Sequence, residues 1–410
     1  MRFRRALARL WASLVTDVAG LRQGLAALAV SSLGDLVAGV TLGAVTGTLN
    51  RLPGLLVLVP AAIGMRGNIF GALGSRLGTA IHTGTFSLSR RRDSIVGQNV
   101  LASVTLTLVV SVALAFLAKG VAVGFGLKSS ITVSDYVVVS VIGGVLSSVV
   151  VLALTLTVSE AAARRGWDMD NVAAPLVTAA GDIVTLPALV VASVLVDHGN
   201  VTAVMAPILG VLALAGAASA WRARLPLMRR IVAESLPILL IAGLIDVVAG
   251  LTIEKRLESF VAFPALLVLV PPFLEDTGAL GGIVASRLAS KLHLGTVTSQ
   301  AVPNRAARED MFLAFLFALP TFVFVAVSAD IVALVFRLDS PGAGVMIGVS
   351  VVGGLASTVI ATLIAYYGSI AAYRFGLDPD NHGIPLITSS MDLVGAVSLI
   401  LALLMFGVRS

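Results

Sequence analysis

Residues 53–85 read PGLLVLVPAAIGMRGNIFGALGSRLGTAIHTGT, and residues 264–296 read PALLVLVPPFLEDTGALGGIVASRLASKLHLGT. Both stretches contain LLVLVP, then Ser-Arg-Leu, then His-x-Gly-Thr, and these shared residues all lie 211 positions apart. A single offset across so many unlike residues indicates an internal duplication.

The same offset continues on both sides of these stretches. Upstream, Asp35 in GDLVAG pairs with Asp246 in IDVVAG. Downstream, at an offset of 210, DMDNVAAPLVTAAGD ending at Asp182 pairs with DPDNHGIPLITSSMD ending at Asp392. The chain is therefore built from two homologous halves, a construction known from transporters.

The composition is that of a membrane protein. Of 410 residues, 58% are hydrophobic and only 12% are charged, whereas soluble domains contain about 25% charged residues. The net charge of +6 comes mostly from Arg in short loops, which indicates membrane topology and not nucleic-acid binding. The chain contains no cysteine, which excludes disulfides, thiolate metal sites and cysteine nucleophiles.

Apolar segments of about 20 residues, the length that crosses a bilayer, predict an all-α polytopic protein with eleven spans. We expect a cytoplasmic amphipathic N-terminal helix in residues 1–24, a first five-span repeat in 25–197, a linker span with a basic cytoplasmic segment in 198–235, and a second five-span repeat in 236–410. Because each repeat has an odd number of spans, the extra linker span makes the two repeats parallel. They should be related by a pseudo-twofold axis along the membrane normal.

The positive-inside rule gives the orientation. With the N-terminus in the cytoplasm, 20 of the 28 Lys and Arg residues lie in cytoplasmic segments, seven lie outside, and Arg66 lies inside a span. We therefore expect a multi-pass protein of the plasma membrane with a cytoplasmic N-terminus and an external C-terminus.

Four aspartates lie inside predicted spans: Asp35, Asp182, Asp246 and Asp392. An ionisable group there costs about 2.5–3.5 kcal/mol on insertion scales, so such residues are candidates for function. They form two pairs related by the duplication, and all four can line one central path. Carboxylates with Asn and Thr nearby suit a hard divalent cation such as Mg²⁺, which keeps several of its waters when bound.

Further candidates lie in or beside the repeated stretches. Pro60 and the glycines after it predict a break in the second span that frees backbone carbonyls, with Asn68 offering a side-chain carbonyl to a hydrated ion. Thr178 and Thr388 accompany Asp182 and Asp392. The second copy differs, because it carries Glu275 and Asp276 in place of Gly64 and Met65. These two acids are either ligands or partners of Arg66.

Two motifs carry a family resemblance. PxLLxxxPxxxGMRGN at Pro53–Asn68, and DNxxxPLVTxxxD ending at Asp182 with a looser copy ending at Asp392, resemble the membrane domain of MgtE-type magnesium transporters. The doubled arrangement is similar to solute carrier family 41, in which one chain carries two such domains. The resemblance implies transport of Mg²⁺ or related divalent cations, with Asp182 and Asp392 at the ion site, and a single chain that functions where MgtE uses two.

Two other readings compete with transport. An intramembrane aspartyl protease needs only one pair of facing aspartates, whereas this chain repeats both members of the pair. A structural membrane protein does not require buried carboxylates at matched positions. The sequence leaves open the coupling ion, Na⁺ or H⁺, and the formation of a homodimer.

Overall fold

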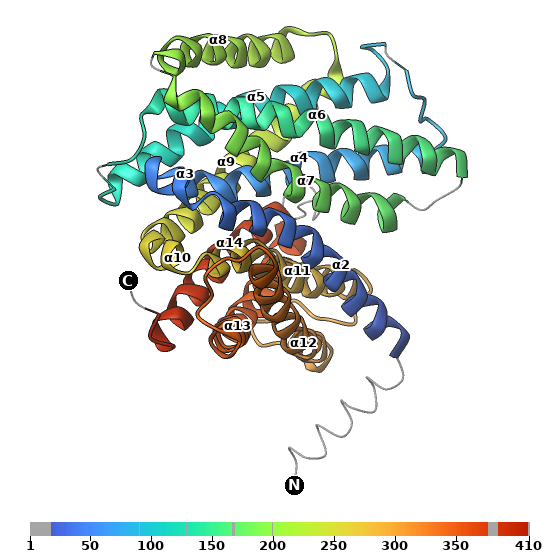
Figure 1. The fold of residues 1–410 in the computed structure, drawn as a ribbon. Helices are drawn as coiled ribbons and strands as arrows, with labels where there is room; N and C mark the ends of the chain where they lie inside the picture. The colour runs from blue at the N-terminus through green and yellow to red at the C-terminus, as the bar shows by residue number, and fades with distance from the viewer. Residues whose placement is uncertain are drawn as a thin grey trace.

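The computed structural model describes residues 18–89, 91–127, 129–165, 169–198, 200–375 and 384–408. The described residues form helices without strands, which confirms the all-α class (Figure 1). Residues 1–17, in which most of the predicted N-terminal helix falls, lie outside the described residues.

One helix order occurs twice along the chain. The first half comprises α2 (Val18–Ala44), α3 (Thr46–Arg51), α4 (Leu55–His82), α5 (Ile95–Gly124), α6 (Val133–Arg165) and α7 (Met169–Ser193). The second half comprises α9 (Pro226–Glu254), α10 (Leu257–Ala262), α11 (Pro264–His293), α12 (Arg305–Val335), α13 (Ala343–Phe375) and α14 (Ile384–Met405). The 3₁₀ turn η1 (Val194–Asp197) and helix α8 (Val201–Arg222) lie between them and have no counterpart.

Ten helices of the described chain are long and apolar enough to cross a membrane, which confirms a polytopic membrane protein. The apolar part of α2, Leu28–Ala44, is shorter than each of these ten helices. The eleventh span and the pseudo-twofold axis along the membrane normal therefore stay predictions.

The predicted break after Pro60 is wrong. Helix α4 runs without interruption from Leu55 to His82 with Pro60 inside it, and α11 likewise continues through Pro271 and Pro272. A proline close to a helix start removes only one hydrogen bond, and here the nearby carbonyl oxygens of Leu56 and Val57 pack closely against Gly250. The helix therefore does not need to unwind.

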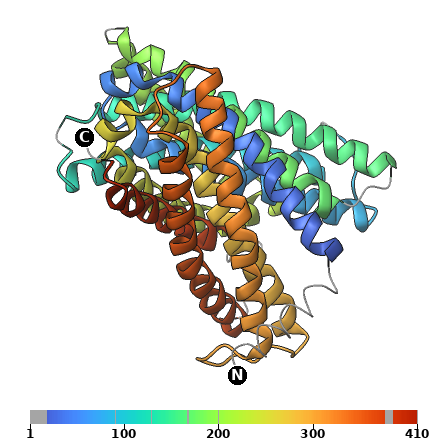
Figure 2. The ribbon, with the colours of Figure 1, turned by 60° about the horizontal axis from the view of Figure 1, so that its bottom comes forward.

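The two halves exchange their first helices. Helix α2 packs against α11 of the other half, and α9 packs against α4 in the same way. In Figure 2, α2 in blue runs beside the orange helices of the second half. Helix α8 instead packs on α5 and α6 of its own side, at the edge of the molecule (Figure 1).

A pair of equivalent glycines permits this exchange. Gly39 of α2 packs against the backbone of Val268, and Gly250 of α9 packs against the backbone of Val57, at positions related by the offset of 211. A Cβ at Gly39 would collide with the carbonyl oxygen of Val268, and one at Gly250 would lie 2.5 Å from that of Val57. Small residues of this kind let membrane helices approach closely.

A buried carboxylate also joins the halves. Glu254, at the end of α9, accepts hydrogen bonds from the backbone N–H groups of Gly54 (2.7 Å) and Leu56 (3.1 Å) at the start of α4. The hydroxyl of Tyr136 donates to the carbonyl of Gly54 from the other side (2.9 Å). A carboxylate at a helix N-terminus satisfies orphan N–H groups and complements the helix dipole.

We expect Gly250→Ala to destabilise the protein, because the added methyl group overlaps the backbone of α4. Overpacking of this kind costs about 1–3 kcal/mol, and the thermal unfolding midpoint of the purified protein should fall. Gly210→Ala on α8 is the matched control, since nothing lies within 4 Å of its Cβ. A midpoint for the first variant equal to or above that of the control contradicts the close approach.

The absence of native cysteine allows a direct topology test. Ser87 follows α4 and Glu258 lies on α10, and both are exposed. The predicted orientation places them on opposite sides of the membrane. In intact cells a membrane-impermeant maleimide should label Glu258→Cys at once and Ser87→Cys only after permeabilisation, and the reverse order would overturn the predicted orientation.

Candidate cation site

A cavity of about 40 Å³ lies between the two halves. This volume exceeds the roughly 10–15 Å³ that one water molecule needs. It is lined by Asp35, Leu42, Leu56, Val59, Pro60, Ile63, Gly64 and Asp182 of the first half and by Ile253, Val270, Pro271, Leu274, Glu275 and Asp392 of the second. Many of these residues are duplicated counterparts, such as Pro60 with Pro271 and Asp182 with Asp392, so the repeated stretches face each other here.

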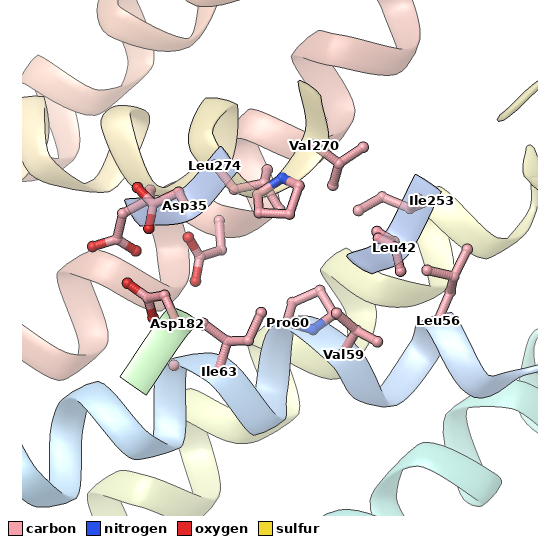
Figure 3. Close-up of a pocket in the computed structure, with 14 residues that line it drawn as sticks. Asp35, Leu42, Leu56, Val59, Pro60, Ile63, Asp182, Ile253, Val270 and Leu274 are labelled. Atoms are coloured by element: carbon pink, nitrogen blue, oxygen red, sulfur yellow. The ribbon is translucent and has the colours of Figure 1, made fainter. Parts of the chain in front are cut away.

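One end of the cavity is acidic and the other is apolar. Four carboxylates converge on the acidic end from different helices: Asp35 on α2, Asp182 on α7, Glu275 on α11 and Asp392 on α14. Figure 3 shows Asp35 and Asp182 at this end, and Leu42, Leu56, Val59, Ile253 and Val270 at the other. The exchange of first helices produces this convergence, because it brings Asp35 beside α11.

Several oxygens of these carboxylates are buried without a hydrogen-bond donor other than a neighbouring carboxyl group. Asp35, Asp182 and Asp246 are 1%, 3% and 1% exposed. The carboxyl groups of Asp35 and Asp182 contact each other, and both oxygens of Asp35, Oδ2 of Asp182 and Oδ1 of Asp246 have no other hydrogen-bond donor within the structure. Buried ionised oxygens are normally paired or bound to a cation, so this arrangement favours an ion as the missing partner.

Asp246 lies beside the cavity and not on its lining. It accepts a hydrogen bond from Ser389, one turn before Asp392. A Cβ built at Gly64 would lie 2.9 Å from Oδ2 of Asp246, so glycine at this position leaves room for the carboxylate. The structure thus brings Asp35, Asp182, Asp392 and Glu275 onto one cavity, with Asp246 adjacent to it.

Asn68 and Thr388 do not line this cavity. Asn68 lines a separate cavity of about 20 Å³ together with Arg76 and Ser235, apart from the carboxylates, and its contact with a hydrated ion stays a prediction. Asn68 follows Gly64 by four residues, so it lies one helical turn, about 6 Å, farther along α4 and beyond the lining of the central cavity. The hydroxyl of Thr388 donates to the carbonyl of Pro385 (3.1 Å), and the side chain of Thr178 lies outside the described residues.

Glu275 and Asp276 do not pair with Arg66. Arg66 is buried in the first half, where its Nε donates to Ser147 (3.0 Å) and its Nη2 to Ser111 (3.4 Å). Asp276 is fully buried and accepts hydrogen bonds from Ser32 on α2 (3.1 and 2.8 Å), outside the cavity lining. Of these two acids, only Glu275 lines the cavity.

Sequence reasoning missed Ser32 and Ser389, which bind acids across helices. Each serine lies three residues before a predicted aspartate, Asp35 or Asp392, on the same helix face. That spacing was a usable signal. Their counterparts in the other half are Gly243 and Ala179, so the duplication did not single them out.

The arrangement suits a hydrated cation. No three His, Asp or Glu side chains of the described chain are grouped closely enough to hold a bare metal ion. Mg²⁺ sheds water reluctantly and usually touches only one or two carboxylates directly, with waters bridging to the others. The carboxylates can therefore contact such an ion largely through water.

The fold and the cavity define a multi-pass membrane protein with converging carboxylates from two related halves, which is the construction of a transporter. The MgtE family model, described as a divalent cation transporter, matches residues 59–192 and 270–402. The chain belongs to the MgtE family of divalent cation transporters, which confirms the resemblance seen in the sequence, and it is not an enzyme.

Similar curated proteins span most of the chain. Solute carrier family 41 member 3 of Rattus norvegicus is 26% identical over 92% of this chain and 85% of its own length. Member 3 of Mus musculus is 27% identical over 83% and 73%, and member 2 of Homo sapiens is 26% identical over 91% and 68%. No solved structure matches the chain.

We expect Mg²⁺ to stabilise the folded protein, because an ion that binds only the folded state offsets the repulsion between buried carboxylates. When the free Mg²⁺ concentration is a hundred times its dissociation constant, the free energy of unfolding rises by about 2.7 kcal/mol. Thermal unfolding of purified protein should therefore shift upward with MgCl₂ concentration. Choline chloride at equal ionic strength serves as the control, and equal shifts with both salts would contradict a specific cation site.

Proposed function

We propose that this chain carries Mg²⁺, or a divalent cation of similar hardness, across the plasma membrane through the cavity between its two repeats. One observation carries the proposal. Carboxylates from both halves converge on a cavity within the membrane-spanning helices, and several of their oxygens are buried without a partner. A passing cation supplies the missing positive charge.

The residues have different proposed roles. Asp35, Asp182, Asp392 and Glu275 face the hydrated ion, and Asp246 supports it from beside Gly64. Asp276 adds negative charge from behind the lining. Thr388 lies one turn before Asp392 and extends the polar surface, and Thr178 precedes Asp182 by the same spacing in the sequence. Asn68 lines the path farther along α4, in the neighbouring cavity.

The apolar end of the cavity controls passage in this proposal. Leu42, Leu56 and Ile253 lie near the helix ends that the topology places outside. A hydrated cation does not cross an apolar constriction until it widens, since such constrictions gate by dewetting. The described shape therefore represents a state closed toward the outside.

One chain supplies both sides of the cavity, so we propose that the single chain is the functional unit. A homodimer would then be an association of complete transporters. Flux that scales linearly with the fraction of active chains in a mixture with an inactive variant supports this assignment.

We expect Asp182→Asn combined with Asp392→Asn to abolish divalent cation flux, because each change removes a charge from the cavity and nearly preserves shape. The measurement is Mg²⁺ uptake into liposomes that contain the purified protein, under imposed Na⁺ or H⁺ gradients that also identify any coupling ion. Flux at the level of empty liposomes is the expected result.

The matched control is Asp93→Asn combined with Asp339→Asn, since both of these aspartates are exposed on loops. Size-exclusion chromatography of each variant checks that it folds. Unchanged flux in the first double variant would move the ion path elsewhere, and wild-type protein without flux under any gradient would overturn transport through this cavity.

A further inference from the structure

An apolar groove lies between α5 and α6, at the helix ends that the predicted topology places in the cytoplasm. Its volume of about 480 Å³ falls within the roughly 300–1,000 Å³ usual for ligand sites. The two helices pack side by side (Figure 1). The apolar part of the lining consists of Leu88, Val96, Val100, Leu101 and Leu156. None of the residues lining this groove also lines the central cavity, so it is a separate site.

The second repeat carries two tyrosines at the corresponding place. At the offset of 210, Leu156 and Thr157 correspond to Tyr366 and Tyr367. The hydroxyls of both tyrosines donate to backbone carbonyls of residues 300–301, in the loop before α12 (2.9 and 3.0 Å). Leucine and threonine are shorter, and in the first half the groove lies between them and the loop before α5. The groove is therefore open where the other repeat is bridged by side chains.

The loop end of the groove is basic. Arg92 and Ser89 line it, and residues 90–92 are three consecutive arginines. Arg92 is exposed and forms no ion pair within the part of the chain that the structure describes. Glu160 is the acid of the lining, and it pairs with Arg164 one turn later on α6. The positive charge of Arg92 is thus left at the mouth of an apolar groove.

We infer that this groove binds an anionic phospholipid of the cytoplasmic leaflet, with its phosphate at Arg92 and Ser89 and an acyl chain along the apolar lining. Arginine is well suited to phosphate because its guanidinium donates two parallel hydrogen bonds. Basic pockets between membrane helices on the cytoplasmic side suit such head groups, and anionic lipids are present in that leaflet. The inference goes beyond the proposed transport and does not depend on it.

The charge of the groove favours a lipid over a segment of this chain. The N-terminal segment, residues 1–17, has four arginines and one acid, so its charge does not complement Arg92. A lipid supplies both a negative group and an apolar chain. Bound there, it joins the loop before α5 to α6, as Tyr366 and Tyr367 join the loop before α12 to α13.

The test is native mass spectrometry of the purified full chain in detergent, titrated with phosphatidylglycerol or with phosphatidylcholine of the same acyl chains. We expect the first phosphatidylglycerol to bind at least about fivefold more tightly than the first phosphatidylcholine, which is the factor that one arginine near a membrane surface contributes. Arg92→Gln should reduce this preference by about fivefold. Arg224→Gln is the matched control, because Arg224 is also exposed in a loop that the topology places in the cytoplasm, and it should leave the preference unchanged.

A second variant tests the groove by filling it. Leu156→Tyr combined with Thr157→Tyr introduces the side chains that the second repeat already carries at these positions. This double variant should weaken binding of the first phosphatidylglycerol by about tenfold or more, because the acyl chain loses its apolar lining. Leu212→Tyr on the exposed face of α8 is the control and should bind as the wild type does.

Each outcome decides the inference. Loss of the head-group preference in Arg92→Gln, together with loss of binding in the filled variant, supports the site. Phosphatidylglycerol binding that neither variant changes places the lipid elsewhere and overturns it. Equal affinity for both lipids in the wild type overturns the anionic assignment. A filled variant that elutes as a particle of half the wild-type size assigns the groove to a second copy of the chain and likewise overturns the lipid.

Discussion

The structure depends on the cost of holding carboxylates inside a membrane protein. Transfer of an ionised carboxylate from water to an apolar interior is strongly unfavourable unless the charge is paired. Arg66 is fully buried and lies two residues after the cavity residue Gly64. Its guanidinium donates hydrogen bonds to serines of α5 and α6 within the first half, and not to the carboxylates. Arg66 therefore does not neutralise the carboxylates at the cavity.

The packing of the two halves holds these carboxylates close together. If each half packed only on itself, Asp35 would lie beside α4 and would face Gly64 in place of Glu275. The exchange of first helices, permitted by Gly39 and Gly250, brings α2 and α11 together instead. Glu254 then ties α9 to the start of α4, so the halves cannot separate without exposing N–H groups of a helix terminus.

Sequence reasoning predicted the features that depend on the duplication and on hydropathy. The helical class, the membrane spans and the pairing of Asp182 with Asp392 all follow from residues compared at a fixed offset. It failed at Pro60, because the cost of a proline depends on its depth in the helix and on which backbone packs against the freed carbonyl.

The duplication does not reveal the serines that donate hydrogen bonds to buried acids. An internal repeat identifies what both copies share, whereas Ser32, Ser389 and Glu275 occur in one copy only. A symmetric dimer of identical halves could not contain such differences, because every residue at its twofold axis faces its own copy. Fusion of two halves into one chain removes that constraint, and each half is then free to change its own side of the cavity. The residues that distinguish this transporter from a symmetric assembly are thus those that break the repeat, and they are found by contrast between the copies after the shared pattern has established which positions correspond.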